Sequence, residues 1–295
     1  MHFNQVAVWG VGLLGGSLGM ALRQRQLATT VIGVGRNIDR LKQALDLGAC
    51  DEITTDPREG FAQADLIVVC MPVAALAESF TILADCVQPG VIVTDVGSTK
   101  QRIVEAAESH LAGRCLFVGS HPMSGAEVSG VQHARADLYK GNPCFLTPTP
   151  STDLQALSTL AQLWQTLGSR VVITDPARHD ELVAAVSHVP HLSSVALTLL
   201  AAGLGEDLNL IPAIVGNGFW DTTRLAKGDL AMWSEICQEN DASILKQLDR
   251  LIEILSQLRE RVRTHEMRDS LSHAAEFRRE LDQLRTLHRA VKDAE

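Results

Sequence analysis

The sequence is poor in aromatic side chains, carries no excess of positive charge and has no closely spaced pair of cysteines. Its 35 acidic and 26 basic residues give a formal charge of −9, which argues against non-specific binding to nucleic acid or to an anionic membrane. The six cysteines form no CxxC motif and lack a histidine at metal-ligand spacing, so free thiols in a reducing cytoplasm are expected instead of disulfides or zinc. We therefore expect a small-molecule partner.

The sequence also lacks a clear targeting or membrane-spanning segment. Its first residues, MHFNQVAVWGVG, reach a glycine turn without a basic region or a long apolar run, which is unlike a secretory signal peptide. The longest apolar stretch, residues 182–204, contains His188, His191 and several serines, and this composition favours a buried core helix over a membrane span. These features predict a cytoplasmic protein.

Short runs rich in Val and Ile alternate with helical patterns through the first half of the chain, which is typical of a parallel sheet with crossover helices. The predicted strands are QVAVWG, TTVIGVG, ADLIVVCMP, GVIVTDV, CLFVGSH, PCFLTP and, after a helix at residues 154–167, RVVITD. Beyond residue 175 only helical periodicity follows. The sequence therefore predicts an α/β Rossmann-type domain at residues 1–175 and an all-α domain at residues 176–295.

An apolar seam in the second half indicates packing of one helix against another. Its members recur at spacings of four and three: Ile244, Leu248, Leu251, Leu255, Leu258 and Val262. Such a seam is equally compatible with a core helix inside one chain and with a helix bundle between two subunits. From Arg259 onward the charged, glycine-free tail predicts one or two amphipathic helices.

The sequence GVGLLGG follows the first predicted strand directly and precedes a helical run. Glycines at GxGxxG spacing in this context permit a tight turn, close approach of the backbone to a pyrophosphate and close helix packing. The N-terminus of the helix then offers N–H groups to the phosphates. The expected contacts with a dinucleotide are Gly10, Gly12, Leu13, Leu14, Gly15, Arg36, Pro72 and Ser98.

The end of the second predicted strand bears on the choice of dinucleotide. In NAD-binding domains this position normally carries an acid that holds the adenosine ribose 2′-hydroxyl, but here Gly35 occupies it and Arg36 follows. An arginine can pair with a 2′-phosphate, and the missing carboxylate removes a repulsion. NADP is therefore predicted over NAD.

Two polar motifs follow later strands, at the sheet edge where ligands bind in such folds. In DVGSTK, Ser98 has a structural explanation, because Ser98–Gln101 reads as a capping box that opens the next helix. In GSHPMSG, His121 is less easily explained by local structure, because Pro122 stiffens the loop while the glycines leave room for a ligand.

A later segment, HDELVAAVSHVPHLSSVAL, places His188 and His191 three residues apart on one helical face, with Pro190 kinking or starting the helix. Zinc can use such a pair, but no third ligand is recognisable nearby, so no metal is predicted.

Farther along, Arg224 and Lys227 lie in a segment flanked by Trp220 and Trp233. A cation in such surroundings is a candidate clamp for a carboxylate of the substrate.

Taken together and in order, the motifs GVGLLGGSL, DVGSTK, GSHPMSG, SHVPH and FWDTTRLAKGDLAMW resemble the prephenate/arogenate dehydrogenase family of tyrosine biosynthesis. The resemblance extends from the N-terminus to about Leu258. It implies an α/β Rossmann-type N-terminal domain plus an all-α C-terminal dimerisation domain, and so favours an intersubunit role for the apolar seam. The implied reaction is an NAD(P)-dependent oxidative decarboxylation of prephenate or arogenate, for which no metal is needed.

The resemblance also implies roles for individual residues. His121 matches the family's catalytic histidine, which hydrogen-bonds the ring 4-hydroxyl of the substrate, and Ser98 matches the serine that orients this hydroxyl and the nicotinamide. His191 matches a second active-site histidine, and Arg224 matches the arginine that binds a substrate carboxylate.

The choice between the two substrates stays open. Arogenate carries an ammonium group where prephenate carries a keto group, and Glu127 could pair with that ammonium, although it is equally well explained as an exposed loop acid. Ala126 stands where some relatives have a hydroxyl residue.

Two rival functions differ in testable ways. A β-hydroxyacid dehydrogenase would share the fold, but its catalytic-lysine motif is not found in this sequence. A non-catalytic NADP-sensing protein would leave the combination of Ser98, His121, His191 and Arg224 unexplained.

Overall fold

A computed structural model describes residues 1–125, 128–204 and 210–293. The chain separates into two compact units, Met1–Ile244 and Leu245–Glu295. The first unit contains the sheet and the helices up to the start of α12, whereas the second contains the rest of α12 and α13. Each unit is described by itself.

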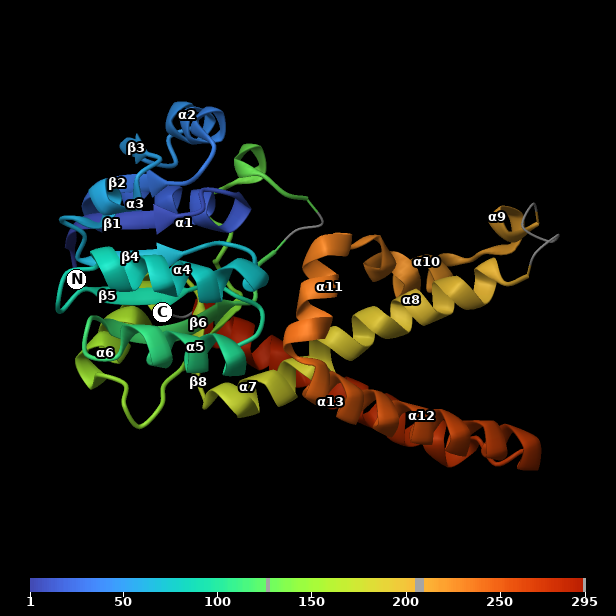
Figure 1. Ribbon diagram of the computed structural model, residues 1–295. Coiled ribbons are helices and arrows are strands. Elements are labelled where there is room, and N and C mark those ends of the chain that lie inside the picture. Colours follow the sequence, from blue (N-terminus) through green and yellow to red (C-terminus); the bar gives the residue numbers. More distant parts are fainter. Residues whose placement is uncertain (126–127, 205–209, 294–295) are drawn as a thin grey trace. The chain divides into compact units, whose positions relative to one another are not determined.

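The first unit is built on an eight-stranded sheet with the order β3-β2-β1-β4-β5-β6-β7-β8 (Figure 1). Strands β3 to β6 run parallel, β7 runs antiparallel to β6, and β8 is parallel to β7. The strands are β1 Phe3–Trp9, β2 Ala28–Val34, β3 Glu52–Thr54, β4 Leu66–Val69, β5 Ile92–Asp95, β6 Leu116–Pro122, β7 Pro143–Thr147 and β8 Arg170–Ile173. All seven predicted strands are confirmed. The three-residue β3 was missed because it is too short for a periodic pattern.

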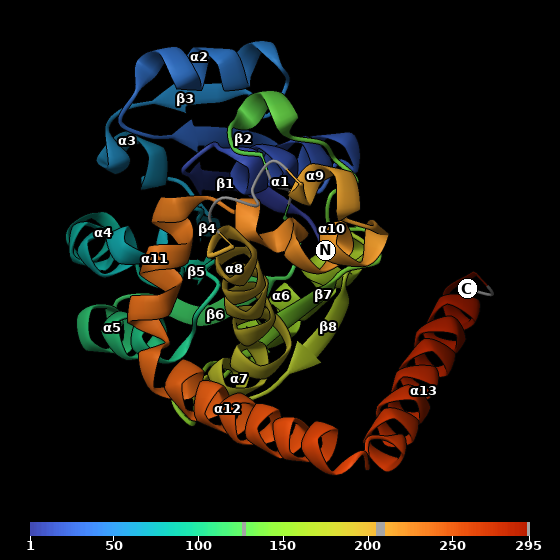
Figure 2. The same ribbon diagram turned by 90° about the vertical axis from the view of Figure 1, so that its right-hand side faces the viewer.

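Helices cover both faces of the sheet, as the two separate apolar clusters require. One cluster joins Leu18 and Leu22 of α1 to Trp164 of α6, and the other joins Leu76 and Phe80 of α4 to the opposite face (Figure 2). These helices are α1 Leu13–Gln24, α2 Ile38–Asp46, α3 Pro57–Phe61, α4 Val73–Cys86, α5 Gln101–Leu111 and α6 Leu154–Thr166. The α/β Rossmann-type fold predicted for the N-terminal half is confirmed.

After β8 the described chain is helical, as predicted. A continuous run consists of α7 Pro176–Val183, a π-helical turn Ala184–His188 and α8 Val189–Ala202. Pro190 lies in the first turn of α8, where it lacks an N–H to donate, and the wider π turn accommodates this interruption. Shorter elements follow: α9 Ile211–Ile214, α10 Asn217–Thr223, a 3-10 turn Arg224–Lys227 and α11 Leu230–Glu239.

The expectation of a buried core helix at residues 182–204 is wrong for its second half. Leu199 and Leu200 are 66% and 72% exposed, so α8 presents apolar side chains that nothing in the described chain covers. The run Pro176–Ala202 is long and apolar enough to cross a membrane by length and composition alone. The core helix of a soluble protein can meet the same criterion, so the run does not by itself indicate a membrane span.

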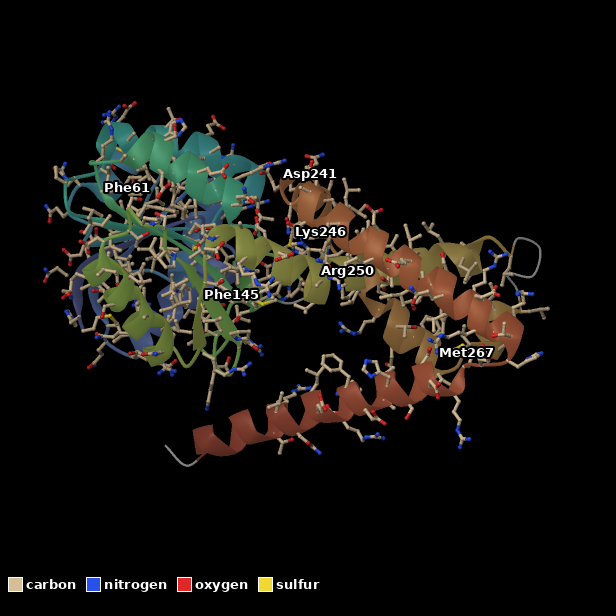
Figure 3. All side chains as sticks on the ribbon, turned by 90° about the horizontal axis from the view of Figure 1, so that it is seen from below. Phe61, Phe145, Asp241, Lys246, Arg250 and Met267 are labelled. Atoms are coloured by element: carbon tan, nitrogen blue, oxygen red, sulfur yellow. The ribbon has the colours of Figure 1, made fainter. Side chains whose placement is uncertain are left out.

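The C-terminal helices are α12 Asp241–Thr264 and α13 Arg268–Asp293, and Met267 lies in the turn that joins them (Figure 3). The predicted seam lies along α12. Ile244 is buried, whereas Leu255 and Val262 are more than half exposed. The amphipathic helices predicted for the tail are confirmed as the end of α12 and α13.

One close approach fixes the position of α1 against the chain that follows α2. A Cβ at Gly19 would lie 1.9 Å from the carbonyl oxygen of Ala49, which is a backbone atom that cannot rotate away. Only glycine fits here, because any side chain would push the helix off the sheet.

We expect Gly19→Ala to lower the free energy of unfolding by about 1–3 kcal/mol, the usual cost of overpacking, as measured by urea denaturation. Gly218→Ala is the matched control, because Gly218 is also helical but has nothing within 4 Å of its Cβ position. The control is expected to be neutral or slightly stabilising, since alanine favours helices more than glycine does. Equal stability of the two variants would contradict the close approach.

Candidate active site

Four of the predicted ligand-binding residues follow strands that end at one edge of the sheet. Strands β1, β4, β5 and β6 are consecutive parallel neighbours, so their carboxyl ends share an edge. Gly10, Pro72, Ser98 and His121 come from these four strand ends. In open parallel sheets this edge is where ligands bind.

The geometry of the glycine-rich loop fits a dinucleotide. Gly10 has φ +101°, and a Cβ there would lie 2.5 Å from the carbonyl oxygen of Cys70, while a Cβ on Gly15 would lie 2.2 Å from the carbonyl oxygen of Gly10. Gly12, the N-cap of α1, has nothing within 4 Å of its Cβ position, and no side chain caps the helix there. The first-turn N–H groups of Leu13 and Leu14 therefore suit phosphate oxygens.

The capping box predicted at Ser98–Gln101 is wrong. Helix α5 has Lys100 as its N-cap residue, and no side chain of this segment caps it. Instead, the carboxylate of Asp180 in α7 accepts the N–H groups of Lys100 at 2.7 Å and Gln101 at 2.9 Å. The cap comes from 80 residues away, so local sequence could not show it, and Ser98 has no part in it.

His121 begins a hydrogen-bonded chain of buried side chains. Its Nδ1 lies 2.8 Å from Nε2 of His179, whose Nδ1 lies 2.8 Å from Oδ1 of Asp180. The carboxylate can only accept, so His179 donates from Nδ1 and its Nε2 accepts the Nδ1 proton of His121. The lone pair of a neutral His121 is thereby left on Nε2, the atom that can take a proton from a ligand.

The surroundings keep His121 neutral. Burial, together with the nearby His179 and Lys100, holds its pKa well below the ordinary value for histidine. Burial likewise lowers the pKa of His179, although Asp180 acts in the opposite direction. The proton-accepting form of His121 consequently dominates at neutral pH.

A fully buried ion pair lies beside this chain. The Lys100 ammonium group pairs with the Asp95 carboxylate, and both side chains are 0% exposed. Asp95 also accepts the N–H groups of Gly97 at 2.8 Å and Ser120 at 3.1 Å. The pair therefore ties the loop that carries Ser98 to the strand that carries His121.

The second histidine pair lies against Trp233 of α11. His191 stacks on its ring with centroids 3.5 Å apart and planes at 10°, whereas His188 approaches it edge-on at 6.0 Å. The predicted common face of the two histidines is confirmed. A Cβ at Gly228 would lie 2.5 Å from Nε1 of Trp233 and 2.8 Å from Cε1 of His191, so the stack needs glycine at this position.

Arg224 and Lys227 lie in the 3-10 turn after α10, and both are exposed. The turn is held against α8, because the N–H of Ala226 donates to the buried hydroxyl of Ser194 at 3.0 Å. Ser194 is three residues beyond His191 on the same helix, so the cationic turn and His191 belong to one local structure. Glu127 and Ala126 lie outside the described residues.

Sequence reasoning missed His179 and Asp180. A His-Asp pair in the first turns of a helix that begins at the N-cap Asp175 looks like an ordinary polar helix start, and only the tertiary contacts give it a role. Phe145 of β7, which is labelled in Figure 3, contributes an aromatic wall. Its ring lies edge-on to that of His179, with centroids 4.9 Å apart. In the described part of the chain, no cluster of histidine, cysteine or acidic side chains could hold a metal ion.

Two family models match the chain in succession. The nucleotide-binding domain of prephenate dehydrogenase matches residues 18–173, and the prephenate dehydrogenase dimerization domain matches residues 175–277.

Individual relatives agree with this match over nearly the whole chain. The structure of prephenate dehydrogenase from Aquifex aeolicus, in complex with hydroxyphenyl propionate and NAD+, has a TM-score of 0.88 and 31% identity, covering 96% of this chain and 99% of that one. Synechocystis arogenate dehydrogenase has a TM-score of 0.83 and 30% identity, with coverages of 95% and 99%. Cyclohexadienyl dehydrogenase of Zymomonas mobilis is 29% identical over 97% of this chain and 98% of its own length.

These matches agree with the geometry of the site, where a dinucleotide loop and a buried, neutral histidine share one sheet edge. They also account for the order of the two domains, the nucleotide-binding domain first and the helical dimerization domain second. The chain therefore belongs to the prephenate/arogenate dehydrogenase family, and its activity is that of a prephenate/arogenate dehydrogenase of tyrosine biosynthesis.

Proposed function

We propose that this chain catalyses the oxidative decarboxylation of prephenate, arogenate or both in the cytoplasm, with His121 as the proton acceptor and NADP favoured over NAD. The observation that carries the proposal is the buried chain His121–His179–Asp180 at the sheet edge that also holds the glycine-rich loop. In this tautomer Nε2 of His121 carries the lone pair that can accept a proton.

The residues of the chain divide the chemistry between them. A bound nicotinamide dinucleotide supplies the acceptor for the hydride that leaves the carbinol carbon as CO₂ departs. His121 accepts the proton of the ring hydroxyl on Nε2 as the hydride leaves, and returns it to the ring oxygen when CO₂ departs and the phenol forms. The transient imidazolium is stabilised through His179 by Asp180. Ser98, on the neighbouring strand end, orients the same hydroxyl. Aromatisation of the ring provides the driving force.

The remaining proposed contacts fix the substrate. His191, which is held by its stack on Trp233, acts as a second active-site histidine in this proposal. Arg224 binds a ring or side-chain carboxylate, with Lys227 of the same turn adding positive charge. Glu127 is retained as the candidate partner of the arogenate ammonium.

Arg36 supports the preference for NADP. It is exposed two residues after the end of β2, while its neighbour Asn37 is engaged in capping α2. A Cβ at Gly35 would meet only Leu41, at an ordinary contact distance of 3.4 Å. Packing therefore leaves room for a side chain at this position and does not explain why an acid is absent. The Aquifex aeolicus relative is bound to NAD+, which makes NAD the alternative cofactor to test.

We further propose a homodimer formed by the helical domain, with the domain boundary at residue 175. The model matched to residues 175–277 is described as a dimerization domain, and the leucines exposed on α8, together with the exposed part of the α12 seam, supply apolar surface for a second copy.

Four parallel assays test substrate and cofactor together: prephenate and arogenate, each with NAD and with NADP, followed by reduced cofactor formation at 340 nm. We expect turnover with at least one substrate and a lower KM for NADP than for NAD. Arg36→Ala should raise the KM for NADP about tenfold or more and change the KM for NAD less than about twofold, since only the 2′-phosphate contact is lost.

The outcomes separate the alternatives. An equal effect of Arg36→Ala on both cofactors would remove Arg36 from 2′-phosphate recognition. Absence of turnover in all four assays would favour the NADP-sensing protein or a different dehydrogenase.

His121→Asn is expected to lower kcat by at least about a hundredfold, because the acceptor for the hydroxyl proton is lost. The dissociation constant of NADP, measured by fluorescence titration, should change little, since the glycine-rich loop is untouched. A near-normal kcat would remove His121 from the mechanism.

A pH profile gives a second readout of the same assignment. Because the pKa of His121 is lowered, its neutral form persists below the ordinary histidine range, and the acid limb of kcat/KM should lie below about pH 6.5. An acid limb above that range would contradict the role of the buried neutral ring.

Arg224→Ala is expected to raise the substrate KM by about 10- to 150-fold, equivalent to about 1.5–3 kcal/mol for a lost charge-assisted contact, while kcat changes less. Arg114→Ala is the matched control, because Arg114 is an arginine that precedes β6 at the opposite edge of the sheet and donates to the carbonyl of Ala84. An unchanged KM in Arg224→Ala would exclude the carboxylate contact.

A further inference from the structure

Asn240 lies at the junction of two helices and has no place in the mechanism described so far. It is the C-cap of α11, and its carbonyl accepts the N–H of Ile244 in the first turn of α12 at 3.0 Å. Its side chain is buried, which is unusual for an asparagine in a turn. A buried amide is expected to have hydrogen-bond partners that explain its position.

One nitrogen of this amide contacts two elements of the site. Nδ2 of Asn240 donates to the backbone oxygen of Asp180 at 2.9 Å and lies 3.3 Å from Nδ1 of His188. A backbone carbonyl can only accept, so the NH₂ group must face it. His188 meets the same NH₂ group, so its Nδ1 is the unprotonated acceptor and its proton is on Nε2.

Each of the two acceptors begins a series of contacts between side chains, which we call a histidine arm. Asp180 holds His179, which holds His121, the proposed base. The ring of His188 lies edge-on to the ring of Trp233, and Trp233 in turn stacks on the ring of His191.

We propose that Asn240 is a positioning residue of the dehydrogenase reaction, whose NH₂ group fixes both histidine arms at their common origin. The proposal rests on the proposed roles of His121 and His191. The positions of the His121 and His191 rings are then set jointly, because Asp180 and His188 accept from the same NH₂ group.

The turn that carries Asn240 has an independent attachment, so the amide is not needed to hold it. Arg102 of α5 donates from Nη1 to the carbonyl of Gln238 at 2.6 Å and from Nη2 to Asp241 at 2.9 Å. These contacts flank Asn240 on both sides. Loss of the Asn240 side chain should therefore disturb the rings more than the backbone.

The first test measures the ring nitrogens of His188 by ¹⁵N NMR in the unmodified protein. We expect Nδ1 of His188 to show the shift of an unprotonated nitrogen and Nε2 to carry the proton. Burial lowers the pKa of His188 to about 4, so the ring is neutral at pH 7. A proton on Nδ1 would overturn the proposal. This readout requires no turnover, so it is independent of the kinetics that test His121.

The second test compares the kinetics of Asn240→Ala with those of Asn142→Ala. Asn142 is a half-buried asparagine whose Nδ2 donates to the backbone oxygen of Leu138 at 3.0 Å, away from the histidines. We expect Asn240→Ala to lower kcat about tenfold or more, because a small displacement of reacting groups has effects of this order, and to leave the KM for the dinucleotide within about twofold. Asn142→Ala should leave both constants within about twofold.

Asn240→Asp keeps the size of the side chain but removes the NH₂ donor, and it replaces Asn240→Ala if the alanine variant does not fold. It is expected to lose kcat to a similar extent. Retention of kcat within twofold by either folded variant, or an equal loss in Asn142→Ala, would refute the positioning role.

Discussion

The site depends on the carboxylate of Asp180, which accepts three N–H groups from two directions. Two come from the backbone at the start of α5, and the third comes from the ring of His179. Accepting the backbone groups satisfies a helix terminus that has no local cap. Accepting from His179 sets the tautomer of that ring and, through it, of His121. One buried side chain therefore couples the packing of α5 to the proposed proton chemistry of His121.

A fully buried ion pair, Lys100–Asp95, joins the segments next to this carboxylate and the candidate base. Lys100 follows the Ser98 loop, and Asp95 binds the backbone just before His121. Losing one partner of such a pair typically costs about 3–5 kcal/mol, since the other charge is left buried alone. Its positive end also contributes to the lowered pKa of His121. Stability and a neutral base thus have a common origin.

The helical half contains aromatic contacts that are complete within the chain and apolar side chains that the chain leaves exposed. Trp233 makes ring contacts with both His188 and His191, all within the first unit. The leucines of α8 stay exposed, as do parts of the α12 seam. This contrast is expected for a domain that completes its apolar packing with a second copy, in agreement with the family model matched there. It also explains why the stretch at residues 182–204 has the composition of a core helix although its second half is exposed.

Local sequence was sufficient for the features that local physics decides. Runs of Val and Ile predicted seven of the eight strands, and the glycine spacing after β1 predicted the nucleotide loop, because tight turns and close approaches exclude other residues. The position of His121 at a strand end also followed, since parallel neighbours bring their carboxyl ends together. The S-T-K-Q segment led to a wrong prediction, because its pattern suggests that Ser98 caps α5, whereas the N–H groups at the start of α5 are accepted by Asp180 of α7.

By itself, then, the sequence determined the order of the elements, the dinucleotide loop and the candidate base. Only the tertiary structure decided which atom of His121 is basic, through His179 and Asp180, and which residue caps α5. It also decided that Asn240 touches both histidine arms. Apart from the bond between the neighbours His179 and Asp180, these depend on hydrogen bonds between residues 52 to 80 positions apart, and no pattern within a single helix or strand encodes such a pairing.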